Sequence, residues 1–226
     1  MCEKRHIRNI GALTPEENEK LRGMEACVVG CGGLGGYITE MLARLGIGSI
    51  RVADGELFDE TNLNRQILCM PGNIGMSKAE AAGERIHLID QDIEVHTFRG
   101  YFDEKNGHEI IGGADIVFDA LDSEGSRKDL EKKCEQENIP LVHGAVEGWS
   151  GQVCVVFPGD RTLERLLASE TGHEEETVSS LSFGPALVAA LQVAEGLKVL
   201  LGRENTLRGR LLGIDLITQE YEVMEI

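Results

Sequence analysis

Apolar and polar residues alternate along the first half of the chain with two different periods. Short apolar runs rich in β-branched residues predict strands at 26–30, 49–53, 93–98 and 114–119. Apolar positions at helical spacing predict helices between them, at 34–45, 77–90 and 126–138. Gly46 is expected to end the first helix, and Ser126 to begin the last. Strands and helices that alternate in this way build a parallel sheet wound on both faces.

The pattern changes after Pro140. Two β-rich runs, at 141–146 and 152–157, are separated by a turn too short for a crossover helix, so they are expected to pair antiparallel. The remaining predicted elements are a helix at 184–201 and strands at 210–215 and 221–226. We therefore expect an α/β fold with a Rossmann-like doubly wound sheet, parallel in the N-terminal half and mixed or antiparallel in the C-terminal half.

The length of the chain bounds its domain organisation. With 226 residues and a hydrophobic share of 42%, it suits a single domain over residues 1–226. Residues 160–182 are polar, acidic and only weakly periodic, which indicates a partly helical excursion from the core. Both a lid over a binding site and a solvated insertion remain open for this segment.

The apolar and cysteine residues favour a cytoplasmic protein. The first residues are charged and polar, without the apolar segment of a signal peptide. The most apolar stretch, 184–202, is interrupted by Gln192, Glu195 and Lys198, so it predicts a buried helix and no membrane partner. The six cysteines lack the spacing of a disulfide framework and suit a reducing compartment.

The formal net charge of −17 argues against a nucleic-acid partner. Binding to phosphates in nucleic acid depends on lysine and arginine, and here 39 acidic residues oppose 22 basic ones. An anionic ligand would need a local basic pocket.

A glycine-rich loop follows the first predicted strand and opens the first predicted helix. Gly30, Gly32, Gly33 and Gly35 give it the pattern GxGxxG, whose backbone amides can approach a phosphate. Asp54 follows about 20 residues later, the usual distance for a carboxylate that accepts hydrogen bonds from a ribose. The pattern predicts a nucleotide site, although a tight turn that packs helix against strand is the alternative.

Cationic residues downstream favour ATP over a dinucleotide. Arg65 lies in the stretch from Asn62 to Gln66, and Lys78 near the start of the second predicted helix. A triphosphate carries more charge than a bridging pyrophosphate and needs such cations. Taken alone, each of these two residues would more often be a surface charge.

Five ordered motifs resemble the ThiF/MoeB/HesA family of sulfur-carrier adenylyltransferases, which share a fold with ubiquitin-activating enzymes. They read VVGCGGLGG, VADGELFDETNLNRQIL, IGMSKAEAAGERI, DIVFDALDSEGSRKDL and PLVHGAVEGWSGQV. The resemblance runs from about Arg5 to the C-terminus. It implies adenylation of the C-terminal glycine of a small ubiquitin-like carrier protein with ATP, and a sulfur donor protein that acts afterwards for molybdopterin, tungstopterin or thiamine.

The resemblance also implies roles for individual residues. Asp54 would hold the ribose, Asn62 and Arg65 would contact phosphates, and Lys78 would neutralise the triphosphate. Asp122 would bind Mg²⁺, which prefers few carboxylates together with phosphate oxygens. Asp119, at the same strand end, is the alternative ligand. The implied nucleotide-binding set is completed by Gly30, Gly32, Gly33, Gly35, Gln66 and Ser123.

Arg8 is assigned from the resemblance to the ATP site of the other subunit in a homodimer, whereas a disordered basic tail is the alternative. His143, in the motif PLVHGA, is expected to be a core histidine with its hydrogen bonds satisfied.

The chain departs from the family in its cysteines. Many members bind a structural zinc through two CxxC pairs, but this chain has no CxxC and no cysteine after Cys154, so no zinc is expected. The segment 171–185 offers only hydroxyls where some members carry a reactive cysteine, so the chemistry is expected to stop at the acyl-adenylate.

Three other functions stay open. Ser123 also resembles the branch of tRNA threonylcarbamoyladenosine dehydratases, although their tRNA substrate suits an acidic chain poorly. A non-catalytic scaffold that binds carrier or nucleotide is the second. A nicotinamide dehydrogenase, the third, explains only the glycine loop and Asp54.

Overall fold

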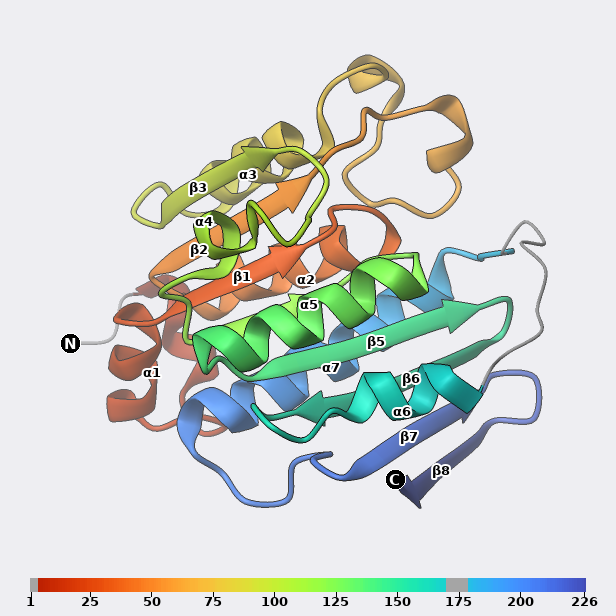
Figure 1. Ribbon diagram of the computed structural model, residues 1–226. Coiled ribbons are helices and arrows are strands. Elements are labelled where there is room, and N and C mark those ends of the chain that lie inside the picture. The colour runs from red at the N-terminus through yellow and green to blue at the C-terminus, as the bar shows by residue number, and fades with distance from the viewer. Residues whose placement is uncertain (1–3, 170–178) are drawn as a thin grey trace.

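The computed structural model describes residues 4–169 and 179–226, whose strands form one eight-stranded sheet in the order β3-β2-β1-β4-β5-β6-β7-β8 (Figure 1). The strands are β1 (Glu25–Val29), β2 (Ser49–Asp54), β3 (Glu94–Arg99), β4 (Ile116–Asp119), β5 (Leu141–Glu147), β6 (Ser150–Val156), β7 (Arg210–Asp215) and β8 (Glu220–Glu225). Strands β1 to β5 are parallel, and β6, β7 and β8 join antiparallel. The predicted fold class is therefore confirmed.

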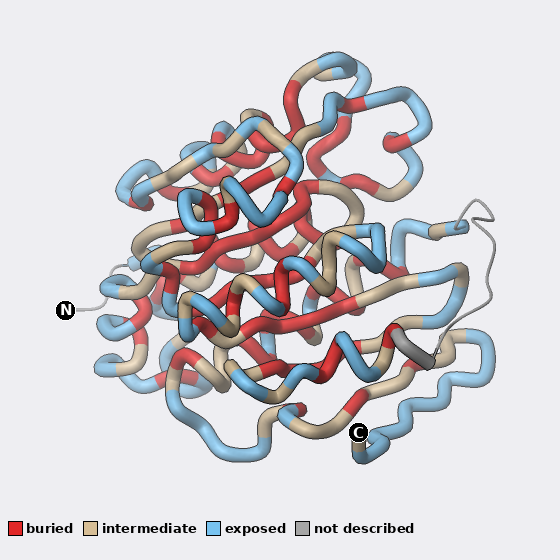
Figure 2. Tube along the Cα trace, viewed as in Figure 1, coloured by how far each residue is buried: buried red, intermediate tan, exposed pale blue. Residues whose placement is uncertain are grey.

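Helices cover both faces of the sheet. The helices are α1 (Pro15–Arg22), α2 (Gly33–Leu45), α3 (Lys78–Ile89), α4 (Gly107–Ile111), α5 (Glu124–Glu137), α6 (Thr162–Ser169) and α7 (Phe183–Leu201). One apolar core lies under α2, α3 and α7, and a second lies under α4, α5 and α6. Figure 2 shows that the central strands are buried, whereas β8 is exposed along its length at the edge of the sheet.

The apolar helix α7 is the one described helix long and apolar enough to cross a membrane by length and composition. Its apolar character has a local explanation, because it packs against α2 and against strands β4, β5 and β6. The three polar residues that interrupt it also have partners. Gln192 donates to the backbone carbonyl of Asp119, Glu195 accepts the backbone N–H of Leu207, and Lys198 pairs with Glu195.

The strands and helices predicted from periodicity begin and end within two residues of their predicted bounds. One predicted cap is wrong: α5 begins at Glu124, because the Ser123 hydroxyl accepts the backbone N–H of Ser126. Ser123 is thus the N-cap, three residues before the predicted one.

The short helices α1, α4 and α6 are not predicted individually from the sequence, although α6 has an apolar face that buries Leu163 and Leu167. Helix α6 falls in the segment expected to be partly helical, and the buried carboxylate of Glu131 on α5 accepts the N–H groups of Leu163 and Glu164 at its start. This contact satisfies N–H groups that the first turn of a helix leaves free. Residues 170–178, where a lid was considered, lie outside the described residues.

Two glycines bring α2 directly against the ends of β1 and β4. Gly30 has φ +97°, and a Cβ there would lie 2.4 Å from the carbonyl oxygen of Ala120. A Cβ on Gly35 would lie 1.8 Å from the carbonyl oxygen of Gly30. Both contacts are with backbone, which cannot move aside as a side chain can, so these two positions require glycine.

We expect Gly35→Ala to lower the free energy of unfolding by about 3 kcal/mol, because the added methyl group must push α2 off the strand ends. Urea denaturation measures the change. Gly125→Ala is the control, since Gly125 lies in helix α5 with no atom within 4 Å of its Cβ position. That control should stabilise the protein by about 0.5–1 kcal/mol. Equal stability of the Gly35 variant and the wild type would contradict the close approach.

Candidate nucleotide site

The carboxyl ends of β1, β2 and β4 meet at one edge of the sheet. From β1 the chain passes to β2 on one side, whereas β4 lies on the other side of β1, which makes the end of β1 a topological switch point. Open α/β sheets bind ligands in the crevice at such a point. The residues that end or follow these three strands are the glycine loop, Asp54 and the segment from Asp119 to Ser123.

The glycine loop contains two kinds of glycine. Gly30 and Gly35 are needed for internal packing, as described above, so the interpretation as a tight turn is correct for them. At Gly32 and Gly33 a Cβ would make only ordinary contacts, 3.5 Å from Gln66 and 3.4 Å from Pro185. Packing therefore does not explain glycine at these two positions, which precede and begin the 13-residue helix α2. Close approach of a ligand to the N-terminal amides of α2 does explain it.

Asp54 is tied to the glycine loop. Its carboxylate accepts the backbone N–H of Cys31 at 2.7 Å and that of Glu56 at 2.7 Å. Burial raises the pKa of this carboxyl group, while the two hydrogen bonds and the nearby Lys78 act in the opposite direction. The carboxylate is thus held in a fixed orientation at the strand end and keeps lone pairs for a hydroxyl donor.

Lys78 is buried at the first position of α3 and points to the same strand end. Only 3% of the residue is exposed, and its ammonium group pairs with the carboxylate of Glu56, whose side chain is 48% exposed. The backbone of Lys78 is also fixed, because its N–H donates to the Glu56 carbonyl at 3.0 Å. A phosphate that displaced Glu56 would meet a positioned, desolvated ammonium group.

The segment that follows β2 folds back over the glycine loop. Asn62 is buried, and its side-chain oxygen accepts the backbone N–H of Asp59, which makes it a structural residue of this turn. Gln66 is also buried, and its Oε1 has no hydrogen-bond partner among the described residues. Arg65 donates only to oxygens of Thr61 and Asn64, and no carboxylate in residues 4–169 or 179–226 pairs with it. Its charge is thus available to an anion.

Asp122 is exposed in the turn between β4 and α5, one residue before the Ser123 cap. No described side chain bonds to its carboxylate, whereas Asp119 is fully buried and held by neighbouring groups. The residues of this turn fit Mg²⁺, because a single free carboxylate beside a phosphate site is the donor set that this ion accepts. The described residues contain no group of three or more His, Cys, Asp or Glu that could hold a metal by themselves.

Arg8 lies away from these residues within its own chain. It is exposed in the 3-10 helix η1 (Lys4–Asn9), where Arg5 pairs with Asp90. His6 of the same helix packs against Gly46 at the C-terminal end of α2, whereas the glycine loop is at the N-terminal end. A helix of 13 residues is about 20 Å long, so Arg8 is separated from the glycine loop of its own chain.

Sequence reasoning missed Glu56, Arg127 and Gln192 at this end of the sheet. Glu56 links Asp54 to Lys78, and Arg127 donates two hydrogen bonds to the Leu121 carbonyl. The position of Glu56, two residues after Asp54 at a strand end, was the available signal for it. Gln192 had a different signal, because it is a polar residue in the most apolar helix.

Comparison with known proteins gives relatives over most of the chain. The SAMP-activating enzyme E1 of Haloferax volcanii is 33% identical over 224 residues, which cover 97% of this chain and 83% of the relative. The molybdopterin-synthase adenylyltransferase of Haemophilus influenzae is 32% identical over 207 residues, 87% of this chain and 83% of that protein. A tRNA threonylcarbamoyladenosine dehydratase of the same bacterium is 34% identical over a shorter stretch of 145 residues, 63% of this chain and 55% of the dehydratase.

Among solved structures, the E. coli MccB structure with ATP matches with a TM-score of 0.83 and 20% identity over 99% of this chain and 72% of that one, a likeness of fold. The ThiF family model matches residues 4–226, and with relatives above 30% identity over most of its length this chain belongs to the ThiF family.

Proposed function

We propose that this protein uses Mg-ATP to adenylate the C-terminal glycine of a small ubiquitin-like sulfur carrier protein. The observation that carries the proposal is the meeting of four groups at one switch point: the amides of α2, the oriented Asp54, the buried Lys78 and the free Asp122. The two relatives matched over most of their length have names of enzymes of this kind.

The reaction we propose is attack of the carrier carboxylate on the α-phosphorus of ATP, with release of pyrophosphate. A carboxylate is ionised at neutral pH, so no general base is required. The protein residues would act by position and charge: Asp54 would orient the ribose, and Lys78 and Arg65 would stabilise the charge of the leaving pyrophosphate. Mg²⁺ held by Asp122 would neutralise phosphate oxygens.

The cysteines support a reaction that stops at the carrier acyl-adenylate. All five described cysteines are buried. Burial raises the pKa of Cys27 to about 12 and raises that of Cys31 and Cys69 as well. The thiolate is the nucleophilic form, so none of these thiols is prepared to accept the carrier as a thioester. A separate sulfur donor protein would then convert the adenylate to a thiocarboxylate.

The second candidate is a tRNA threonylcarbamoyladenosine dehydratase, favoured by the shorter match to that enzyme. The net charge of −17 opposes a tRNA substrate. A dehydrogenase would bind NAD, so comparing the thermal shifts given by Mg-ATP and by NAD distinguishes it from the proposed enzyme. A non-catalytic scaffold would bind its ligand without turning it over, so a turnover assay distinguishes it.

The test of the proposed function is formation of a carrier-AMP adduct. The protein is mixed with Mg-ATP and candidate carriers that end in glycine, and the mass of each carrier is measured. A gain of one adenylate on one carrier, lost when its terminal glycine is deleted, is the expected result. Absence of an adduct with every sulfur carrier, together with ATP turnover on tRNA, would favour the dehydratase instead.

Arg65→Ala and Lys78→Met should each reduce ATP–pyrophosphate exchange by at least ~100-fold, because each removes one preorganised charge from the phosphate site. The free energy of unfolding of Lys78→Met should nevertheless lie within about 1 kcal/mol of the wild-type value. Methionine fills the buried volume of the lysine stem, and the released Glu56 is half exposed. Lys132→Met, at a 60% exposed side chain on α5, is the matched control with normal exchange. Near-normal exchange in both site variants would refute the phosphate site.

Arg8 should complete the ATP site of the opposite subunit in a two-fold homodimer. Arg8 lies at the other end of α2 from the glycine loop of its own chain, so it would reach ATP only in the site of the partner subunit. Arg8→Ala and Arg65→Ala homodimers should each be nearly inactive. Refolded together in equal amounts, they should recover about a quarter of wild-type activity, because half the dimers are mixed and each mixed dimer has one intact site.

Tagged mixed dimers are isolated to confirm that they form. No recovery of activity in confirmed mixed dimers would show that Arg8 does not act across the interface.

A further inference from the structure

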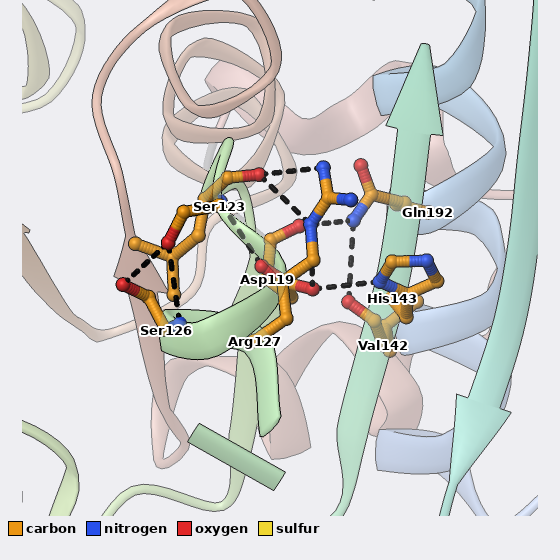
Figure 3. Close-up of polar contacts among 8 residues, drawn as sticks. Asp119, Ser123, Ser126, Arg127, Val142, His143 and Gln192 are labelled. Carbon is orange, nitrogen blue, oxygen red and sulfur yellow. Dashed lines mark hydrogen bonds and ion pairs between the residues drawn. The ribbon is translucent and has the colours of Figure 1, made fainter. Parts of the chain in front are cut away.

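The carboxyl end of β4 is held by side chains from three neighbouring elements (Figure 3). Asp119, the last residue of β4, is fully buried, and its Oδ1 accepts the backbone N–H of Leu121 at 3.0 Å. Its Oδ2 is 2.6 Å from Nδ1 of His143, the residue paired with it on the adjacent strand β5. On α5, Arg127 donates to the Leu121 carbonyl from Nε at 3.1 Å and from Nη2 at 2.8 Å.

The peptide groups of Leu121 are thus fixed on both sides, its N–H by Asp119 and its C=O by Arg127. The next residue is Asp122, whose own carboxylate is free. Side chains that restrain the backbone immediately before a ligand residue determine the direction in which that residue points. Asp122 has no such restraint of its own, so its direction depends on the Leu121 peptide.

The opposite face of the sheet contributes a further anchor. Gln192 on α7 donates from Nε2 to the backbone carbonyls of Asp119 at 2.8 Å and Val142 at 3.2 Å. A Cβ on Gly144 would lie 2.3 Å from Cδ of Gln192, so glycine at 144 makes room for this side chain. The backbone at the ends of β4 and β5 is therefore fixed from α7. The Oδ2 of Asp119 faces His143 Nδ1 at 2.6 Å and, at the longer distance of 4.0 Å, Nε of Arg127.

His143 has a single polar partner. It is fully buried, and its Nε2 has no hydrogen-bond partner among the described residues, whereas Nδ1 faces Asp119. A proton on Nε2 would be an unsatisfied buried donor, so the proton is assigned to Nδ1, which donates to the carboxylate. The expectation of a satisfied core histidine is thus met at one ring nitrogen only, and that nitrogen acts on Asp119.

We propose that His143 is a positioning residue: through Asp119 it fixes the Leu121 peptide and so sets the direction of Asp122. The inference rests on the proposed function for the role of Asp122, but its first step concerns only residues of this chain. A purely structural role for His143 would stabilise the core without affecting Asp122 in particular.

Three variants separate these roles. His143→Leu fills the ring volume without a donor, whereas His143→Asn keeps a donor near the position of Nδ1 and should restore the contact. Cys154→Ala is the matched control, because Cys154 is buried and paired with His143 across β5 and β6, yet it makes no hydrogen bond to this network. Urea denaturation gives the stability of each variant.

The first measurement is hydrogen exchange of the Leu121 amide, followed by NMR on leucine-labelled protein without nucleotide or metal. His143→Leu should speed this exchange at least ~tenfold, while His143→Asn and Cys154→Ala should leave it near wild type after correction for stability. Unchanged exchange in His143→Leu, or equal acceleration in Cys154→Ala, would overturn the proposal. The amide exchange rate thus tests whether His143 fixes the Leu121 peptide, even if the protein adenylates no carrier.

The second measurement is Mn²⁺ binding to the ATP complex by electron paramagnetic resonance, a probe of the Mg²⁺ position. His143→Leu should weaken Mn²⁺ binding by about tenfold, the lower range for loss of an outer-shell partner. In an Asp122→Asn background the same substitution should add no further loss, because its effect passes through Asp122. Additive losses would show that His143 does not act through Asp122. Normal Mn²⁺ binding in Asp122→Asn alone would instead refute the metal role in the proposed function.

Discussion

The close backbone approach at Gly30 and Gly35 determines where the N-terminal amides of α2 lie relative to the ends of β1 and β4. Without side chains at these positions, α2 begins directly against the ends of β1 and β4, and a Cβ at either would overlap a carbonyl oxygen. The N-terminal amides of α2 thereby lie at the end of β1. Asp54, at the end of β2, is on one side of them, and the turn with Asp122, after β4, is on the other. A helix displaced by even a methyl group would separate these amides from Asp54 and Asp122, the groups proposed to hold ribose and metal.

Much of the fold could be predicted because the hydrophobic periods were unambiguous. The parallel half follows from β-branched runs alternating with amphipathic helices, and the antiparallel half from a turn after β5 too short to cross over. Helix α1 has almost no apolar residues, and its capping box between Thr14 and Glu17 gives its start a signal that hydrophobic patterning does not register. The N-cap of α5 is Ser123, whereas Ser126 was predicted, because two serines three residues apart offer the same capping hydroxyl and the sequence does not distinguish them.

The site could be predicted only as far as its residues follow one another in motifs. The spacing predicted that the glycine loop and Asp54 serve one site, but it did not predict the direct hydrogen bond that joins them. Sequence could not distinguish the packing glycines, Gly30 and Gly35, from the two that leave room for a ligand. That difference depends on how closely α2 approaches the Gly30 carbonyl and, for Gly30, on the position of Ala120 ninety residues away. The contact between Asp119 and His143 was missed for the same reason, because it requires the register of β4 against β5.

The pairing of Lys78 with Glu56 is compatible with the triphosphate ligand that we propose for this acidic protein. A lysine that is 3% exposed loses most of its hydration, and a counterion close by offsets the free-energy cost of burying its charge. Glu56 provides that counterion, and because its side chain is 48% exposed it would return to water at little cost if the proposed phosphate replaced it. The exchange of one anion for another leaves the buried charge balanced at each stage. The net charge of −17 belongs to the whole chain, whereas at the strand ends Lys78, Arg65 and the amides of α2 supply positive charge beside the carboxylates of Asp54 and Glu56.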